Sequence, residues 1–333
     1  MAILSRLSEL RLNMSPVLSA KALGYNPGGM IGHKILSPVP CGEAGVRLPL
    51  YSPSALKIID DLRALRGASK RADWTVSYQD VTLDEHTLNV PVDWREIRAG
   101  QTIGLDVAAR ASRTAKRLVV TQREYNIAQY VMSTSNYGTG FSTTVGGTTN
   151  KWDSITSGVS DQDPVAIIKT AASKVRAACG TRPTKFWCGQ RVWDDGIANN
   201  TKVIAQLKLA PPTTAAPVWV TPEAFAAAIG VEKVEIGGAV YSSDGLVIGG
   251  DIWLDAAGLV VYNEDVTSVE QPTYGLLAQE KFGSVGESDM FGFVSTEIEE
   301  GGKIVSTYYT ELYKPWTAMN FAGYLWLDTL GVI

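Results

Sequence analysis

The sequence has few of the residues on which catalytic and metal sites depend. Its 333 residues include three cysteines, Cys41, Cys179 and Cys188, and two histidines, His33 and His86. An odd number of widely separated cysteines predicts no disulfide framework, and Cys179 and Cys188 lack companions for a zinc site. The P-loop, nucleophile-elbow, HExxH and CxxC motifs are also missing. We therefore expect no catalytic residues, no metal and no cofactor, and we interpret the cysteines as packing residues.

Long hydrophobic runs are absent as well. The first fifteen residues, MAILSRLSELRLNMS, are interrupted by charge every few positions, unlike the apolar stretch of a secretory signal. The most apolar region, residues 245–262, contains Asp251 and Asp255 and falls short of the roughly 20 apolar residues that a membrane helix needs. We expect a protein that is made in the cytoplasm and does not enter a membrane.

Positive charge is concentrated in the first part of the chain. The net charge is -4 overall, but it is +5 over residues 1–133 and -9 over residues 134–333. Such a gradient is compatible with an anionic partner near the first part, or with an unevenly charged solvated surface.

The first 93 residues predict two extended features. Residues 1–45 contain many prolines and glycines and no sustained apolar period, which indicates an extended arm rather than a packed helical layer. Strand-like residues 46–52 and 74–83 follow, about twenty residues apart, which is too far for a tight hairpin. We expect this pair to form the base of a long projecting β-loop.

A long helix is predicted from Gln101 to Ser133, because this stretch lacks proline and spaces its apolar residues helically. A continuous helix here would be roughly 50 Å long. Arg110, Arg113 and Arg117 fall on one face, with Lys116 next to them. This face is either an ordinary solvated surface or a stripe that meets phosphates.

Capping residues mark two further helices. Asp163 suits an N-cap, Pro164 the first helical position and Gly180 the left-handed residue after the helix. A second helix is expected to begin at Thr221 and to be closed by Gly230.

Strands alternate with these helices and predict a compact α/β or α+β domain near residues 183–265. The tail from residue 290 returns to a strand pattern, with a hairpin turn at Gly301 and Gly302.

The cluster Asp84, Glu85 and His86 is the clearest group of titratable residues. In a strand, successive side chains alternate, so Asp84 and His86 share a face that Glu85 does not. We interpret the cluster as the polar side of a partly exposed strand rather than a reactive site. It could also lie at a subunit contact that responds to pH.

Four segments, in this order along the chain, resemble a known family. They are VLSAKALGYNPGGMIGHKILSPVPC (17–41), YQDVTLDEHTLNVPVDW (78–94), the stretch from Trp152 to Gly196 and TPEAFAAAIGVEKVEIGGAVY (221–241). The set is similar to the major capsid proteins of tailed double-stranded DNA bacteriophages, which have the Hong Kong 97 type fold that encapsulin shells share. PTKF at 183–186 departs from the Pro-Asn that is frequent in these coats.

The resemblance implies an α+β Hong Kong 97 type capsid fold. Its first part would be an extended N-terminal arm at 1–45, followed by an extended β-loop (E-loop) at 46–93. A peripheral domain at 94–182, with the spine helix at 101–133, would precede an axial domain at 183–265, and residues 266–333 would return through the β-strands of both domains. It also implies that residues 2–40 can be deleted without unfolding the subunit, with loss of shell closure.

The implied function is structural. The chain would be a major capsid protein that self-assembles into hexamers and pentamers of an icosahedral head, in the virion, after assembly in the host cytoplasm. Its partners would be itself, a separate scaffolding protein, a portal, a decoration protein in some relatives, and double-stranded DNA bound without sequence preference. The alternatives are an encapsulin-like shell and, from another class, a carboxylate-dependent hydrolase.

Two sets of residues follow from the resemblance. Candidates for facing the DNA are Arg110, Arg113, Lys116 and Arg117, and candidates for an inter-subunit loop are Arg63, Arg66, Lys70, Arg71, Asp84 and His86. Some relatives crosslink their subunits through a lysine, and Lys70 would lie at the tip of the loop. No asparagine or glutamate partner stands out, so we assign no crosslinking residues.

Overall fold

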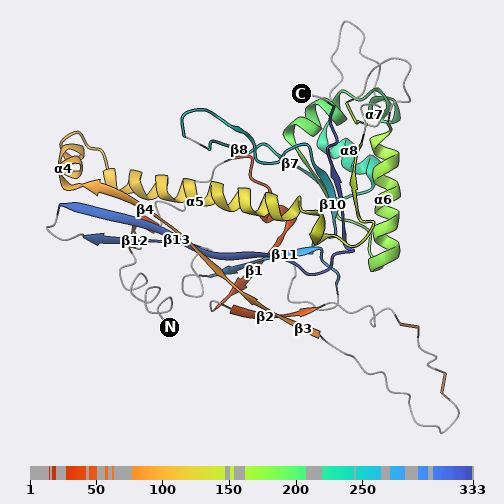
Figure 1. The fold of residues 1–333 in the computed structure, drawn as a ribbon, viewed down its shortest axis with the longest axis horizontal. Coiled ribbons are helices and arrows are strands. Elements are labelled where there is room, and N and C mark those ends of the chain that lie inside the picture. The colour runs from red at the N-terminus through yellow and green to blue at the C-terminus, as the bar shows by residue number, and fades with distance from the viewer. Residues whose placement is uncertain are drawn as a thin grey trace, which may run out of the picture.

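The computed structural model describes residues 15, 17–19, 28–42, 45–50, 57–58, 62–63, 77–146, 151–153, 162–207, 220–243, 245–263, 271–281, 292–298 and 303–331. These residues form an α+β structure with two five-stranded sheets and two short two-stranded ribbons. One long helix lies along the first sheet, and the second sheet, with its own helices, stands at one end of that helix (Figure 1).

The larger sheet is built around one long strand, β13 (Ile304–Thr317). Its first part is flanked by β12 (Gly292–Ile298) on one side and β4 (Asp84–Asp93) on the other, both antiparallel. Its last part pairs with β11 (Gly275–Glu280), which pairs in turn with the parallel strand β1 (Ser37–Cys41). Strands β12 and β13 are antiparallel neighbours, as a hairpin requires; Gly301 and Gly302 themselves lie outside the described residues.

The long helix α5 (Val107–Val131) packs on β4 and β13. The prediction of one continuous helix over residues 101–133 is wrong at its beginning, because a separate helix, α4 (Trp94–Thr102), precedes a turn. Gly104 takes a φ of 72°, and the Asp106 carboxylate accepts a hydrogen bond from Ala109 N (3.0 Å), so α5 starts with its own N-cap. Its 25 residues extend over roughly 38 Å.

The smaller sheet has the order β5 (Ser142–Thr144), β14 (Gly323–Leu327), β10 (Ala257–Val260), β6 (Lys185–Gly189), β7 (Lys233–Gly237). The compact region expected near residues 183–265 therefore supplies only the last three of these strands. The first two come from distant parts of the chain, and β14 pairs with β10 to extend the sheet. Distant pairing of this kind leaves no local signal in the sequence.

Helices pack against both faces of the smaller sheet, each over its own cluster of buried hydrophobic residues. One face packs against α6 (Pro164–Cys179), a π-helical turn (Val192–Ala198), α7 (Thr201–Gln206) and α8 (Pro222–Ile229). The other face packs against the end of α5 and the short helix α3 (Gly32–Ile35). Successive side chains of β6 point to opposite faces of the sheet. Phe186 and Cys188 pack on the face covered by α6 and α8, and Trp187 packs on the face covered by α5 and α3.

The predicted caps of α6 and α8 are confirmed. The Asp163 carboxylate accepts from Ala166 N (3.2 Å), and Gly180 closes α6 with a φ of 82°. In α8, the Thr221 hydroxyl accepts from Ala224 N (3.3 Å), and Gly230 has a φ of 77°. None of the helices in the described ranges is long and apolar enough to cross a bilayer.

The segment at residues 28–41 is part of the subunit core. Ile31, Ile35 and Leu36 are almost completely buried in the cluster that joins α5 to the smaller sheet, and β1 is a strand of the larger sheet. The prediction of an extended arm over residues 1–45 is therefore wrong for this segment, because its apolar residues are buried within the same chain. For the same reason, we now expect deletion of residues 2–40 to unfold the subunit.

The two expected strands at the base of a long loop are paired. Strand β2 (Gly45–Leu50) runs antiparallel to β3 (Ser77–Thr82), with Leu50 opposite Ser77, and most of residues 51–76 between them lie outside the described residues. A second small ribbon joins β8 (Val240–Tyr241) and β9 (Gly250–Asp251).

Candidate functional site

A basic ridge runs along the outer face of α5. Arg110, Arg113 and Arg117 are exposed, while the opposite face of the helix packs on β4 and β13. The first and last of these arginines are roughly 10 Å apart along the axis. Among the described residues, no carboxylate lies within ion-pair distance of the three. The neighbouring helix α4, which contacts α5, carries exposed Arg95 and Arg98 and also exposed Glu96. The surface can therefore hold an extended anion.

Lys116 does not belong to this ridge. Its side chain is on the sheet side of α5 and is only 5% exposed. Ser112 and Val120, one turn before and one turn after, are buried on the same face, which follows from the 3.6-residue helical period. Burial lowers the pKa of Lys116, and the Glu311 carboxylate opposes this shift. The prediction that Lys116 faces DNA is thus corrected by the structure.

A buried charged cluster fixes α5 on the larger sheet. Arg123 Nη1 lies 2.9 Å from Glu311 Oε2, and both side chains are largely buried between α5 and β13. The Tyr309 hydroxyl donates to the other oxygen of Glu311 (2.7 Å). Both carboxylate oxygens therefore have donors, as a buried charge requires.

Substitution of Glu311 by alanine is expected to lower the free energy of unfolding by about 3–5 kcal/mol, because it leaves the Arg123 charge buried without its carboxylate. Urea denaturation followed by tryptophan fluorescence measures this loss. Glu297→Ala, at an exposed position of neighbouring strand β12, is the matched control and should change stability by less than about 0.5 kcal/mol. Equal effects of the two substitutions would contradict the assignment.

Asp84 and His86 contact the neighbouring strand of their own sheet. Asp84 forms an ion pair with Lys314 (3.2 Å), and the His86 ring stacks on Tyr313 with centroids 4.2 Å apart. Burial lowers the pKa of His86, while Asp84 and Glu311 oppose this shift. The cluster is therefore the polar side of a partly exposed strand, as interpreted from the sequence. These residues lie in β4 rather than on a projecting loop.

Of the remaining loop candidates, Arg63 is exposed, and Arg66, Lys70 and Arg71 lie outside the described residues.

The three cysteines are packing residues. Cys41, Cys179 and Cys188 are free thiols, each buried in a different hydrophobic cluster. Burial raises the pKa of all three thiols, which suppresses the reactive thiolate form. Over the ranges that the structure describes, no three His, Cys, Asp or Glu side chains gather as metal ligands would.

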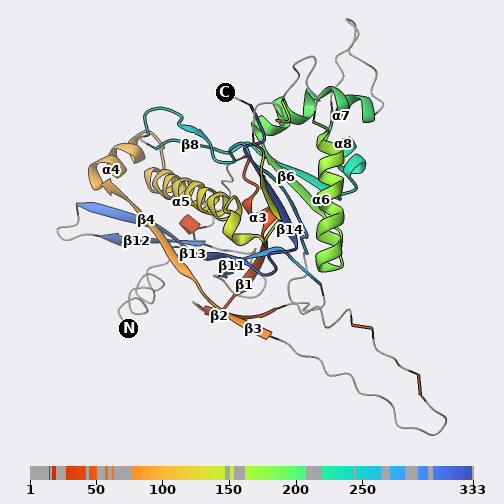
Figure 2. The ribbon, with the colours of Figure 1, turned by 45° about the vertical axis from the view of Figure 1, so that its right-hand side comes forward.

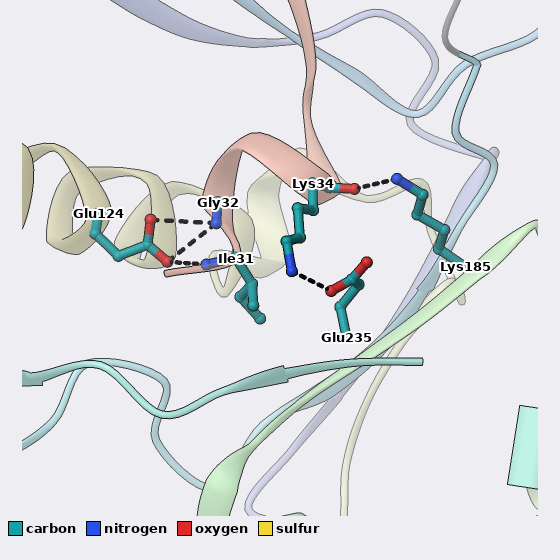
Figure 3. Close-up of polar contacts among 6 residues, drawn as sticks. All are labelled: Ile31, Gly32, Lys34, Glu124, Lys185 and Glu235. Carbon is teal, nitrogen blue, oxygen red and sulfur yellow. Dashed lines mark hydrogen bonds and ion pairs between the residues drawn. The ribbon is translucent and has the colours of Figure 1, made fainter. Parts of the chain in front are cut away.

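A carboxylate that was not singled out from the sequence ties three parts of the chain together. Glu124 of α5 accepts hydrogen bonds from Ile31 N (2.7 Å) and Gly32 N (3.0 Å), at the start of α3, and from Trp253 Nε1 (2.8 Å). Figure 3 shows the carboxylate facing the two backbone amides. We call Glu124 and these three donors the Glu124 clasp.

Two further contacts hold α3 beside the smaller sheet. Lys34 Nζ forms an ion pair with Glu235 of β7 (2.8 Å), and Lys185 Nζ of β6 donates to the Lys34 carbonyl (2.8 Å), as drawn in Figure 3. The polar contacts of α3 therefore reach both the long helix and the smaller sheet.

The clasp needs a glycine at position 32. A Cβ there would lie 2.8 Å from Glu124 Oε2 and 3.0 Å from Ile127. A usable signal for the clasp was present in the sequence, because Glu124 interrupts the apolar stripe of Val120, Ile127 and Val131. A carboxylate in a buried stripe implies buried donors.

Comparison with known proteins shows similarity along nearly the whole chain. The major capsid protein of Burkholderia phage BcepMu is 26% identical over 327 residues, covering 97% of this chain and 98% of that protein. No protein-family model matches the chain.

Solved structures share the fold. A phage-related protein from Bordetella bronchiseptica superposes with a TM-score of 0.71 at 22% identity, covering 95% of this chain and 97% of that one. The encapsulin SrpI from Synechococcus elongatus has a TM-score of 0.52 at 11% identity, covering 89% of this chain and 85% of that one.

Proposed function

Taking the chain as a phage major capsid protein, we propose that it assembles with copies of itself into the hexamers and pentamers of an icosahedral head. The observation that supports this most is its similarity to a major capsid protein over 97% of its length. That relative is a structural protein, and we assign this chain no enzymatic activity.

The finer divisions of a Hong Kong 97 type subunit fit the order of the elements. In this proposal α5 is the spine helix of a peripheral domain, and the smaller sheet with α6 and α8 forms the core of the axial domain. The β2–β3 ribbon is the base of the E-loop. The arm is shorter than expected, since residues 28–41 belong to the core.

Analytical ultracentrifugation tests assembly. The purified chain is expected to form pentamers, hexamers or larger shells as its concentration rises, with closure promoted by a scaffolding protein. A monomer that persists at all concentrations, with and without scaffold, would overturn the proposal.

The basic ridge of α5 is proposed to face the packaged DNA. Its three arginines are exposed and lie along one line, as contacts to a phosphate backbone require. Contact through phosphates would be independent of sequence and weakened by salt. Lys116, by contrast, is assigned to the subunit core.

Changing Arg110, Arg113 and Arg117 together to glutamine is expected to weaken binding of the subunit to duplex DNA. If each arginine contacts one phosphate, the slope of log affinity against log salt should fall by about 3. Fluorescence anisotropy at several salt concentrations measures the slope.

The matched control removes the same number of charges elsewhere. Lys169, Arg176 and Arg182 are exposed in α6 and just after it, and their replacement by glutamine should leave the slope unchanged. Equal slopes for the wild type and the α5 variant would favour an ordinary solvated face.

An encapsulin-like shell is the second candidate, because the SrpI fold is similar. The contents of purified particles separate the two functions: packaged DNA supports a phage head, whereas an enclosed protein cargo supports the encapsulin-like shell. The carboxylate-dependent hydrolase has no support from the similar proteins.

A further inference from the structure

The β8–β9 hairpin presents an apolar tip to solvent. Leu246, Val247 and Ile248 are consecutive, and their side chains are 87%, 68% and 70% exposed. Asp244 of this hairpin lies outside the described residues. Three adjacent aliphatic side chains on a protein surface are characteristic of an interaction site. We call these three residues the apolar tip.

The apolar tip is held in place by the hairpin itself. Gly245 N donates to the Ser242 hydroxyl (2.9 Å), which donates to the Val247 carbonyl, and Gly249 N donates to the Tyr241 carbonyl (2.8 Å). At the base, the Tyr241 ring packs against Tyr125 of α5 at 5.4 Å. Little ordering is therefore needed when the tip meets a partner.

A hollow of about 520 Å³ lies between α8 and the edge strand β7. Its lining includes the small or apolar residues Pro222, Ala226, Ala227, Val231 and Val234. The volume is within the range of about 300–1,000 Å³ that is typical of pockets enclosing small ligands. Charged side chains, including Glu223 and Glu232, also line it.

The hairpin and the hollow lie on opposite sides of the smaller sheet. In both views the β8 hairpin projects on the side of α5, whereas α8 lies on the far side of the sheet with α6 (Figures 1 and 2). When a projection on one side of a subunit binds a hollow on the other side of the next copy, the contacts are head-to-tail and close into rings if the rotation permits.

We propose that the apolar tip of one copy inserts into the α8–β7 hollow of the next copy around a ring. This inference rests on the proposed function, in which five or six copies surround one axis. It identifies which surfaces meet: the aliphatic tip at residues 246–248, which follows Asp244, and a hollow lined by small or apolar residues and by the charged Glu223, Glu232, Lys233 and Glu235.

Disulfide crosslinking tests the contact in assembled particles. The double variant Val247→Cys with Ala227→Cys, at two exposed positions, should give a ladder of covalent oligomers up to five or six copies under mild oxidation. The native cysteines are buried and do not compete. Ile103→Cys with Ala227→Cys is the control, since Ile103 is equally exposed but lies in the turn before α5; it should give no ladder.

Three other results of this experiment would each contradict part of the account. Dimers from Val247→Cys alone would indicate that two tips meet around a two-fold axis, which would overturn the head-to-tail contact. Particles that assemble from the double variant without any crosslink would also overturn it while leaving the proposed function intact. Failure of the wild-type chain to assemble at all would instead contradict the proposed function.

A charge at the tip gives a second test. Val247→Asp should reduce the yield of assembled particles at least ten-fold, because it would place a carboxylate in the hollow. Ser243→Asp adds the same charge at an exposed position of the same hairpin and should assemble like the wild type. Circular dichroism checks that both variants are folded. Normal assembly of Val247→Asp would overturn the inference.

Discussion

Replacing Glu124 with alanine is expected to lower the free energy of unfolding by at least about 3 kcal/mol, because three buried donors lose their acceptor at about 1–3 kcal/mol each. The donors are the backbone amides of Ile31 and Gly32 and the indole of Trp253. Together with Glu124 they join three segments that are far apart in the sequence, so the loss also loosens the junction between α3, α5 and the smaller sheet. Chemical denaturation of the unassembled subunit measures the effect.

Two variants separate the clasp from a general effect on α5. Glu124→Gln keeps one acceptor oxygen and should be intermediate. Gln129→Ala, at an exposed position of the same helix, should change stability by less than about 0.5 kcal/mol. A Glu124→Ala subunit as stable as the Gln129→Ala subunit would show that the clasp contributes nothing.

Deletion of residues 2–41 is expected to abolish the folded subunit. It removes Ile31, Ile35 and Leu36 from the core and strand β1 from the edge of the larger sheet. It also removes two of the three donors to Glu124. Circular dichroism and size-exclusion chromatography should show an aggregated or unfolded chain.

Deletion of residues 2–27 is the matched control. It spares α3 and β1 and removes the contacts of Ser15 and Ser19 with Val294, each a hydrogen bond worth about 1 kcal/mol. This shorter deletion should leave a folded subunit in which shell closure can be assayed. A folded subunit after deletion of residues 2–41 would mean that the N-terminal segment is an arm after all.

Local rules predicted the helix ends well. Asp163, Pro164 and Gly180 define α6, and Thr221 and Gly230 define α8, because capping depends on a few neighbouring residues.

Features that depend on distant contacts were predicted less well. The proline- and glycine-rich pattern of residues 28–41 concealed a core segment, whose burial depends on Glu124 and on pairing with β11. Lys116 was placed among exposed arginines because the helix face that meets β4 and β13 was unknown. Only three of the five strands of the smaller sheet lie in the predicted region, because β5 and β14 join it from outside residues 183–265.

Electron microscopy of the purified chain, alone and with a scaffolding protein, tests the central claim most directly. A phage major capsid protein is expected to form closed icosahedral shells built from hexamers and pentamers. Small, discrete oligomers under both conditions would contradict the account.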